Sequence, residues 1–231
     1  PIARAADAND LPSGLGTVYQ FLAESYTSGS TTWPEARGGS VATISNSATK
    51  VTNTAGTLGA SKAVVAVQGT VNTVLTFPTT IGPGTSSDYT FLYVARYAPI
   101  SGSAYQAGNY CDVTAHNAGT DGKSRIFTSG TGNWLSGFWA CAAGVAYHEG
   151  WVTDSANSVT ELRSGNDNNW LLGTDCGYTV ASTSACKGRF RAFGTDRTVT
   201  ASTSTGVHQV GVHIGIYGGE QSDYQIAEVI S

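Results

Sequence analysis

The sequence is poor in charge, and this shortage narrows the kind of protein that it encodes. Charged side chains make up 12% of its 231 residues, about half the roughly 25% of an ordinary soluble domain. The helices of cytosolic enzymes are usually rich in Glu and Lys, so the composition favours a secreted β-protein with a surface of Ser, Thr, Asn and Gly. A net charge of −4 with 12 basic residues argues against nucleic acid as a partner, because phosphate binding needs a clustered Lys/Arg surface.

Three further features are missing from the sequence. No apolar run reaches the roughly 18 residues of a membrane-spanning helix, no Asn-x-Ser/Thr glycosylation acceptor occurs, and the chain contains no Met. The lack of a long apolar run argues against membrane insertion. Without an Asn-x-Ser/Thr acceptor, any glycan would have to be attached to Ser, Thr or hydroxyproline. From the absence of Met we expect a processed or excised part of a longer protein.

Cysteine is scarce, and its spacing is informative. The four cysteines are Cys111, Cys141, Cys176 and Cys186, which lack the paired C-x₂-C spacing of a zinc site. An even count in a chain of this composition favours two disulfides and an oxidising compartment over four buried free thiols. Of the three pairings, we favour Cys111–Cys141 and Cys176–Cys186, the second closing a short hairpin.

β-strand patterns are abundant. Segments rich in Val, Thr, Tyr, Phe and Ile mostly alternate with period two, and turn-forming residues bound them. These segments are residues 61–77, 88–98, 123–130, 144–153, 169–175, 188–202, 208–218 and 223–231. One short helix or turn is expected at 17–26. Residues 1–16 are turn-rich and predict an N-terminal arm or linker, followed by a single all-β domain over 17–231, a jelly-roll sandwich of two antiparallel sheets.

The stretch "SGFWACAAGVAYHEGW" (136–151) poses the question of a catalytic site. His148 beside Glu149 suggests catalysis or metal binding, but neighbours on a strand point to opposite faces. A zinc-protease motif would need a second His at position 152, which is Val152. We therefore expect one core face and one outer face, with residues 147, 149 and 151 on one and 146, 148 and 152 on the other, in a pair of central strands.

Tryptophan is the sequence's main candidate for ligand contact. Aromatic rings present apolar faces that can stack on a ligand, and Asn-rich loops such as "SGNDNNW" (164–170) supply hydrogen bonds. The candidates are Trp134, Trp139, Trp151, Asn168 and Trp170. Tryptophan also dominates burial in sandwich cores, so which of these rings face a ligand stays open.

Calcium is a weaker alternative. Hard cations take several oxygen ligands, and three loops rich in Asn, Asp and Gly contain Asp121, Asp167 and Asp223. The simpler interpretation is that such residues form turns. We therefore expect no cofactor and no metal site.

The order of several phrases resembles a known family. They are "TTWPEARGGSVATIS", "YTFLYVARYA", "RIFTSGTGNWLSGFW", "AGVAYHEGWVT", "NNWLLGTD", "RFRAFGTDRTVT" and "SDYQIAEVIS". Together, over residues 19–231, they resemble the laminin-G-like branch of the concanavalin A-like lectin/glucanase superfamily. The resemblance implies a jelly roll that serves as a non-enzymatic module of a secreted or cell-surface protein and binds carbohydrate or neighbouring proteins. The segment 176–186 departs from the family pattern.

Two alternatives remain open. The first is a purely structural subunit that self-associates in a filament, sheath or capsid. The second is a polysaccharide lyase, because "TELRSG", "HQVGVHIG" and "GIYGGEQ" resemble the strands of alginate-lyase-like jelly rolls. In that reading Arg163 neutralises a uronate carboxylate, and His213 and Tyr217 act as base and acid. The lysine of that pattern is missing, and so is the paired-Glu pattern of the glucanases, so we expect no enzyme.

Overall fold

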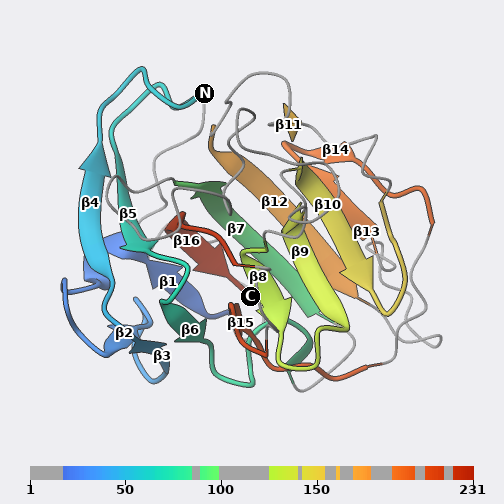
Figure 1. The fold of residues 1–231 in the computed structure, drawn as a ribbon, viewed down its shortest axis with the longest axis horizontal. Helices are drawn as coiled ribbons and strands as arrows, with labels where there is room; N and C mark the ends of the chain where they lie inside the picture. The colour runs from blue at the N-terminus through green and yellow to red at the C-terminus, as the bar shows by residue number, and fades with distance from the viewer. Residues whose placement is uncertain are drawn as a thin grey trace.

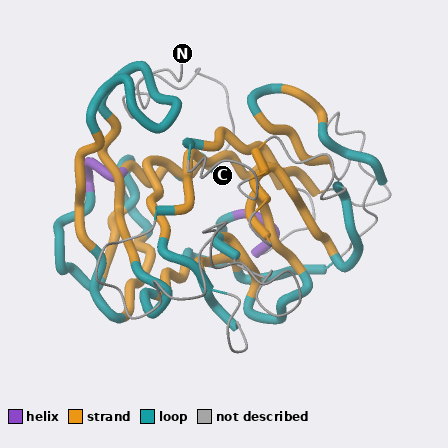
Figure 2. Tube along the Cα trace, turned by 45° about the horizontal axis from the view of Figure 1, so that its top comes forward, coloured by secondary structure: helices purple, strands orange, loops and turns teal. Residues whose placement is uncertain are grey.

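The chain folds as two antiparallel β-sheets packed face to face, as predicted (Figure 1). The computed structural model describes residues 18–84, 89–98, 125–139, 142–153, 160–161, 169–177, 189–200, 206–215 and 221–231. Strand dominates these residues (Figure 2), and two short 3-10 turns interrupt it, η1 (Ala23–Ser25) and η2 (Gly82–Gly84).

The first sheet, which we term sheet A, has the order β14-β13-β12-β7-β16-β5-β4. Strand β1 pairs with the second half of β16, whose first half pairs with β5 on the same edge. The strands are β1 (Gln20–Leu22), β4 (Thr49–Asn53), β5 (Val64–Gly69), β7 (Tyr89–Tyr97), β12 (Leu171–Gly177), β13 (Arg189–Ala192), β14 (Thr195–Asp196) and β16 (Tyr224–Ile230).

The second sheet, sheet B, has the order β11-β10-β9-β8-β15-β6-β3-β2. Its strands are β2 (Thr32–Pro34), β3 (Val41–Ser45), β6 (Val74–Thr76), β8 (Phe127–Ser129), β9 (Trp134–Trp139), β10 (Ala142–His148), β11 (Thr160–Glu161) and β15 (Val210–Val212). In Figure 1, β8, β9 and β10 cross in front of β7 and β12, so the β9–β10 half of sheet B covers the β7–β12 half of sheet A.

Alternation along the strands builds the core between the sheets. In β7 ("YTFLYVARY"), every second residue from Phe91 to Tyr97 is buried, and these side chains point inward. Rings from the two sheets meet there: the Tyr93 and Phe127 ring centres lie 4.5 Å apart, and those of Tyr97 and Phe138 lie 5.0 Å apart. Aromatic pairs of this kind add to the stability supplied by burial.

Tyr93 spans the sandwich because two glycines leave room for its ring. Its hydroxyl lies 3.0 Å from the Ser136 hydroxyl of the opposite sheet. A Cβ on Gly173 in sheet A or on Gly137 in sheet B would overlap the Tyr93 ring or its hydroxyl. These glycines therefore fix where the two sheets approach each other.

Several element boundaries differ from the prediction. Residues 61–77 form β5 and β6 in different sheets, separated by a turn in which the Thr73 amide donates to the Thr70 carbonyl. The short helix or turn expected at 17–26 is the strand β1 followed by the single turn η1, and the inward side chain of Phe21 on β1 packs in the core. The short strands β2, β3 and β4 carry an alternation too brief to stand out in the sequence.

The predicted strand pair in 136–151 is confirmed as the β9–β10 hairpin. Its place in the sheet differs, because β10 has a single short strand, β11, between it and the edge. A bulge at Gly144, with φ of +92°, shifts the register between Ala143 and Val145. Glycine adopts this φ without strain.

Candidate functional site

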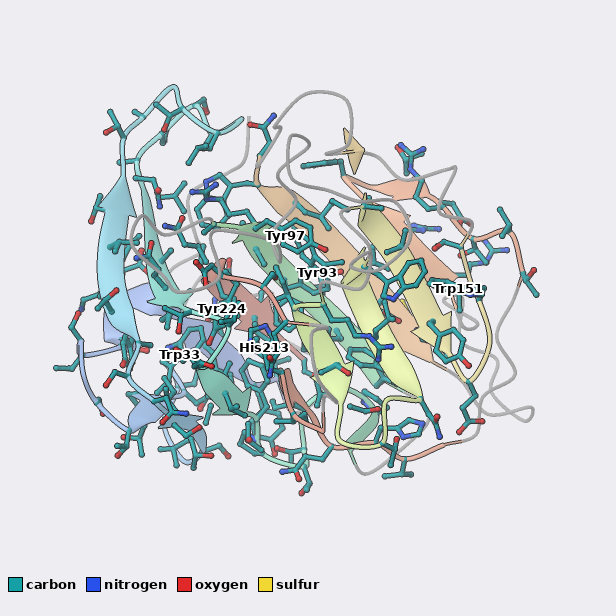
Figure 3. All side chains as sticks on the ribbon, in the orientation of Figure 1. Trp33, Tyr93, Tyr97, Trp151, His213 and Tyr224 are labelled. Atoms are coloured by element: carbon teal, nitrogen blue, oxygen red, sulfur yellow. The ribbon has the colours of Figure 1, made fainter. Side chains whose placement is uncertain are left out.

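An aromatic cluster lies on the outer face of sheet B. It consists of Trp139 on β9, Tyr147 on β10 and Trp151 in the turn that follows β10. The Trp151 ring centre lies 4.8 Å from that of Trp139 and 5.4 Å from that of Tyr147, and both contacts are edge-to-face. In Figure 3, Trp151 lies on the β10 side of the molecule, well apart from the labelled core residues Trp33 and Tyr224.

A tight turn brings Trp151 back over β10. Strand β10 ends at His148, and Glu149 takes a left-handed conformation with φ of +55°. The His148 amide donates to the Gly150 carbonyl at 2.9 Å, and Trp151 forms an antiparallel bridge with Tyr147. Bridged residues carry their side chains on the same face, so the indole of Trp151 packs against the Tyr147 ring.

The aromatic cluster rests on a small apolar layer outside the main core. Leu135, Ala142 and Val145 are buried on the outer face, and Trp139 and Tyr147 pack against them. Of the chain's five tryptophans, Trp151 is the exposed one, with 41% of its surface accessible. A partly exposed indole on a buried apolar base is a rigid platform that a planar apolar ligand face can cover.

The two faces of β10 separate as predicted. Ala146, His148 and Val152 are buried, whereas Glu149 and Trp151 are exposed and Tyr147 is half-buried. His148 and Glu149 thus do not converge on one substrate atom. Alternation accounts for Ala146, Tyr147 and His148 within β10, whereas Glu149 is directed away from His148 by the left-handed turn in which the strand ends.

His148 belongs to a buried polar cluster between the sheets. Its Nε2 lies 2.8 Å from Oδ1 of Asp175 on β12. The Tyr89 hydroxyl donates to the same oxygen at 3.1 Å, and the Trp134 indole donates to the Tyr89 hydroxyl at 2.7 Å. Burial, and then the nearby Asp175 charge, raise the pKa of Tyr89 well above its usual value. The cluster ties β7, β9, β10 and β12 together, and the completely buried Asp175 is out of reach of a substrate.

Sequence reasoning missed Asp175 and Tyr89. A signal was present in "NNWLLGTD", because Leu171, Gly173 and Asp175 occupy alternate positions of one strand. A carboxylate at an inward position needs a partner, since an unpaired buried charge is costly. The identity of that partner depends on the packing of β10 on β12.

A second histidine contact lies beside the turn that carries Trp151. His208, which precedes β15, is buried, and its Nε2 lies 3.4 Å from Glu149 Oε1. Burial lowers the pKa of His208, the Glu149 carboxylate offsets part of that shift, and nearby His148 adds to it. His208 therefore stands next to the exposed face without being on it.

Two of the candidate tryptophans are not available to a ligand. Trp134 and Trp170 are buried, at 1% and 2% exposure. Trp134 points into the sandwich by strand alternation, and Trp170 packs on the outer face of sheet A with the Arg96 guanidinium 5.8 Å from its ring centre. For these two candidates the choice that the sequence left open falls to the core, since large indoles stabilise a fold mainly by burial. Asn168 lies outside the described residues.

The lyase arrangement gains no support from His213. This side chain is buried, with Nδ1 3.2 Å from the Thr73 carbonyl and Nε2 accepting the Ser222 amide at 3.3 Å. Burial lowers its pKa to about 4. Both ring nitrogens are used by the main chain, so His213 is not free to act as a base. Arg163 and Tyr217 lie outside the described residues.

The metal and disulfide expectations fall partly outside the described residues. Asp223 is buried and accepts the Val71 amide at 2.9 Å, a structural bond. Asp121 and Asp167 are not described, and the described residues hold no group of three His, Cys, Asp or Glu side chains placed for a metal ion. Cys176 in β12 is disulfide-bonded. Cys111, Cys141 and Cys186 are not described, so neither favoured pairing is tested, although β12 and β13 do pair as a hairpin.

Comparisons with known proteins add little. No protein-family model and no curated protein matches the chain. One solved structure, titled a mutant of Trypanosoma rangeli sialidase displaying trans-sialidase activity, aligns at 10% identity and a TM-score of 0.45, over 92% of this chain and 30% of that one. The chain thus spans under a third of that protein, and a likeness this distant carries no argument. No helix among the described residues is long and apolar enough to cross a membrane.

Proposed function

We propose that the chain is a non-enzymatic β-sandwich module of a secreted or cell-surface protein and that it binds carbohydrate through the aromatic cluster of Trp139, Tyr147 and Trp151. The observation that carries the proposal is the 41% exposure of Trp151, which packs on two half-buried rings above a buried apolar layer. The low charge and the ordered phrases that resemble laminin-G-like domains support the same proposal.

Sugar rings have apolar C–H faces that suit this surface. An indole held in place by two neighbouring rings loses little conformational freedom when a ligand covers it, so most of the contact energy is retained as affinity. Trp151 keeps 41% of its surface accessible while its ring packs edge-to-face against Trp139 and Tyr147. The geometry suits stacking of a sugar ring on the indole of Trp151.

The test is a glycan array followed by affinity electrophoresis of the full chain. Trp151→Ala should weaken retention by about tenfold, since stacking on an aromatic ring contributes about 1.5 kcal/mol. Val41→Ala is the matched control, because Val41 is 50% exposed on the same outer face of sheet B, at β3. This control should bind as the parent protein does.

Three outcomes would reject parts of the proposal. Absence of glycan binding, together with failure to associate with matrix proteins, would reject the binding function as a whole. Specific self-association without any glycan binding would favour the structural-subunit alternative. Release of an unsaturated product from alginate or other uronates, seen as ultraviolet absorbance, would establish the lyase instead.

A further inference from the structure

The turn that presents Trp151 is attached to the sandwich through Glu149. The Glu149 amide donates to the Asn133 carbonyl at 2.7 Å, and the Glu149 side chain, 43% exposed, reaches His208. A Cβ on Gly206 would overlap both the His208 Nε2 and the Glu149 Oε1, so the pair is seated directly against the main chain at a position that takes glycine. The contact is therefore enclosed on one side and open to water on the other.

His208 is held firmly on its far side. Its Nδ1 lies 3.2 Å from the Thr131 hydroxyl, which lies 3.2 Å from the Ser129 hydroxyl. Ser129 Oγ in turn accepts the Trp134 amide at 3.1 Å, and the His208 amide donates to the Pro83 carbonyl at 2.7 Å. These bonds orient the imidazole and aim Nε2 at Glu149.

The link between His208 and Glu149 is incomplete in the neutral state. The separation of 3.4 Å between Nε2 and Oε1 is longer than a well-formed hydrogen bond, and the buried Nε2 has no other hydrogen-bond partner. A second proton on the ring creates an imidazolium facing a carboxylate. Charge-assisted bonds of this type are shorter and about twice as strong as neutral ones.

We propose that His208 is a positioning residue, which holds the Trp151 turn through Glu149 and holds it more tightly when the imidazole is protonated. The proposal rests on the proposed carbohydrate function, whose binding surface this turn carries. Binding of sugar is then stronger in mildly acidic than in alkaline solution. His208 does not itself contact the ligand, because it is 6% exposed.

The charged and titratable neighbours of His208 influence the pH range in which its ring takes up a second proton. Glu149 faces it from the turn and His148 from the end of β10, with Asp175 and Tyr89 behind His148. The lowered pKa of His208 keeps the ring neutral in alkaline solution and places proton uptake below the usual value of 6.5. The Thr131 hydroxyl can donate to a neutral Nδ1 or accept from a protonated one, so both states keep that bond.

The first experiment is a ¹H–¹⁵N NMR titration of the histidine rings in the full chain. If protonation strengthens the link to Glu149, then Glu149 must raise the pKa of His208, because the coupling is reciprocal. Glu149→Gln should therefore lower the His208 pKa, whereas Glu24→Gln, at an exposed site on η1, should leave it unchanged. An unchanged His208 pKa in Glu149→Gln overturns the proposal.

The second experiment measures the accessibility of Trp151 and the binding of polysaccharide separately. Acrylamide quenching of tryptophan fluorescence, with Trp151→Phe to identify the Trp151 part, should be weaker at pH 5.5 than at pH 8 and should lose this difference in Glu149→Gln. Affinity electrophoresis in gels containing cellulose ether, xylan or mannan should show about threefold stronger retention at pH 5.5 than at pH 8, the equivalent of about 0.7 kcal/mol. In His208→Gln, both the quenching and the retention in the gel should be equal at pH 5.5 and pH 8.

The outcomes separate the two claims. No retention in any gel, with the NMR and quenching effects present, rejects carbohydrate binding but leaves the positioning role of His208 established. Retention that Trp151→Ala abolishes, but that is the same at both pH values, supports the carbohydrate function and overturns the role of His208. The NMR titration and the quenching experiment both depend on Glu149→Gln, so these tests stand even if His208→Gln does not fold.

Discussion

Acidification should destabilise the protein through His213. Burial lowers the pKa of His213 from 6.5 to about 4, with backbone hydrogen bonds to Thr73, Arg125 and Ser222 offsetting part of the shift. As the pH falls below 6.5, unfolded chains take up this proton before folded chains do. The contribution is therefore complete above pH 6.5 and is lost by about pH 4. At about 1.4 kcal/mol per pKa unit, the loss is about 3 kcal/mol.

The matched variant for this prediction is His213→Asn. Its Nδ2 can replace the Nδ1 donor to Thr73, it does not titrate, and Asn tolerates the left-handed φ of +59° found at this position. Urea denaturation at pH 7.5 and pH 4 measures the free energy of unfolding of both proteins. The parent should lose about 3 kcal/mol more than the variant between these pH values. Equal losses in the two proteins would refute the assignment of the acid sensitivity to His213.

Three further substitutions test the packing and the buried charges. Gly173→Ala should cost about 2 kcal/mol in urea denaturation because its Cβ overlaps the Tyr93 ring; Gly130→Ala, with open space around the added Cβ, is the control, and equal stability of the two variants would contradict the packing argument. Asp175→Asn should lower stability by about 2 kcal/mol, because an uncharged amide oxygen accepts more weakly than the Asp175 carboxylate from the buried His148 and the half-buried Tyr89; a thermal midpoint equal to that of the parent would count against it. Burial raises the pKa of Glu228, so its stabilising contribution is present below the usual pKa of 4.5 and is lost as the pH rises through the folded value. Glu228→Gln should therefore stabilise the protein more at pH 8 than at pH 4. An equal effect of this substitution on the free energy of unfolding at the two pH values would show that the buried carboxylate carries no penalty.

Much of the fold could be predicted from the sequence because long strands leave a strong period-two pattern. Strand β7 was predicted within one residue at each end, since alternate inward residues are large and apolar. A strand of three residues such as β2 contains too few alternations to be distinguished from a loop. The sequence predicts a single strand segment over residues 61–77 because the turn at 70–73 carries the same Thr and Val residues as the strands around it.

The candidate site could be predicted in part. Alternation correctly placed Tyr147 on the face opposite to His148, and the predicted separation of His148 from Glu149 is confirmed, although the turn after β10 rather than strand alternation produces it. Whether that face was core or surface could not follow from alternation, because both faces of β10 are apolar near Val145. The position of Trp151 over Tyr147 depends on the left-handed conformation of Glu149, which the sequence "HEGW" does not specify.

The sequence by itself determined the class of fold and which residues of a long strand share a face, because both follow from local periodicity and from turn-forming residues. The tertiary structure decided which side chains from different strands meet. Asp175 is 27 positions from His148 and Glu149 is 59 positions from His208, and their contacts exist because sheet A packs on sheet B and because the chain before β15 passes beside the end of β10. Such contacts depend on the register and stacking of sheets, which no local pattern encodes. The exposure of Trp151 is decided in the same way, by the turn that folds it outward onto Trp139 and Tyr147.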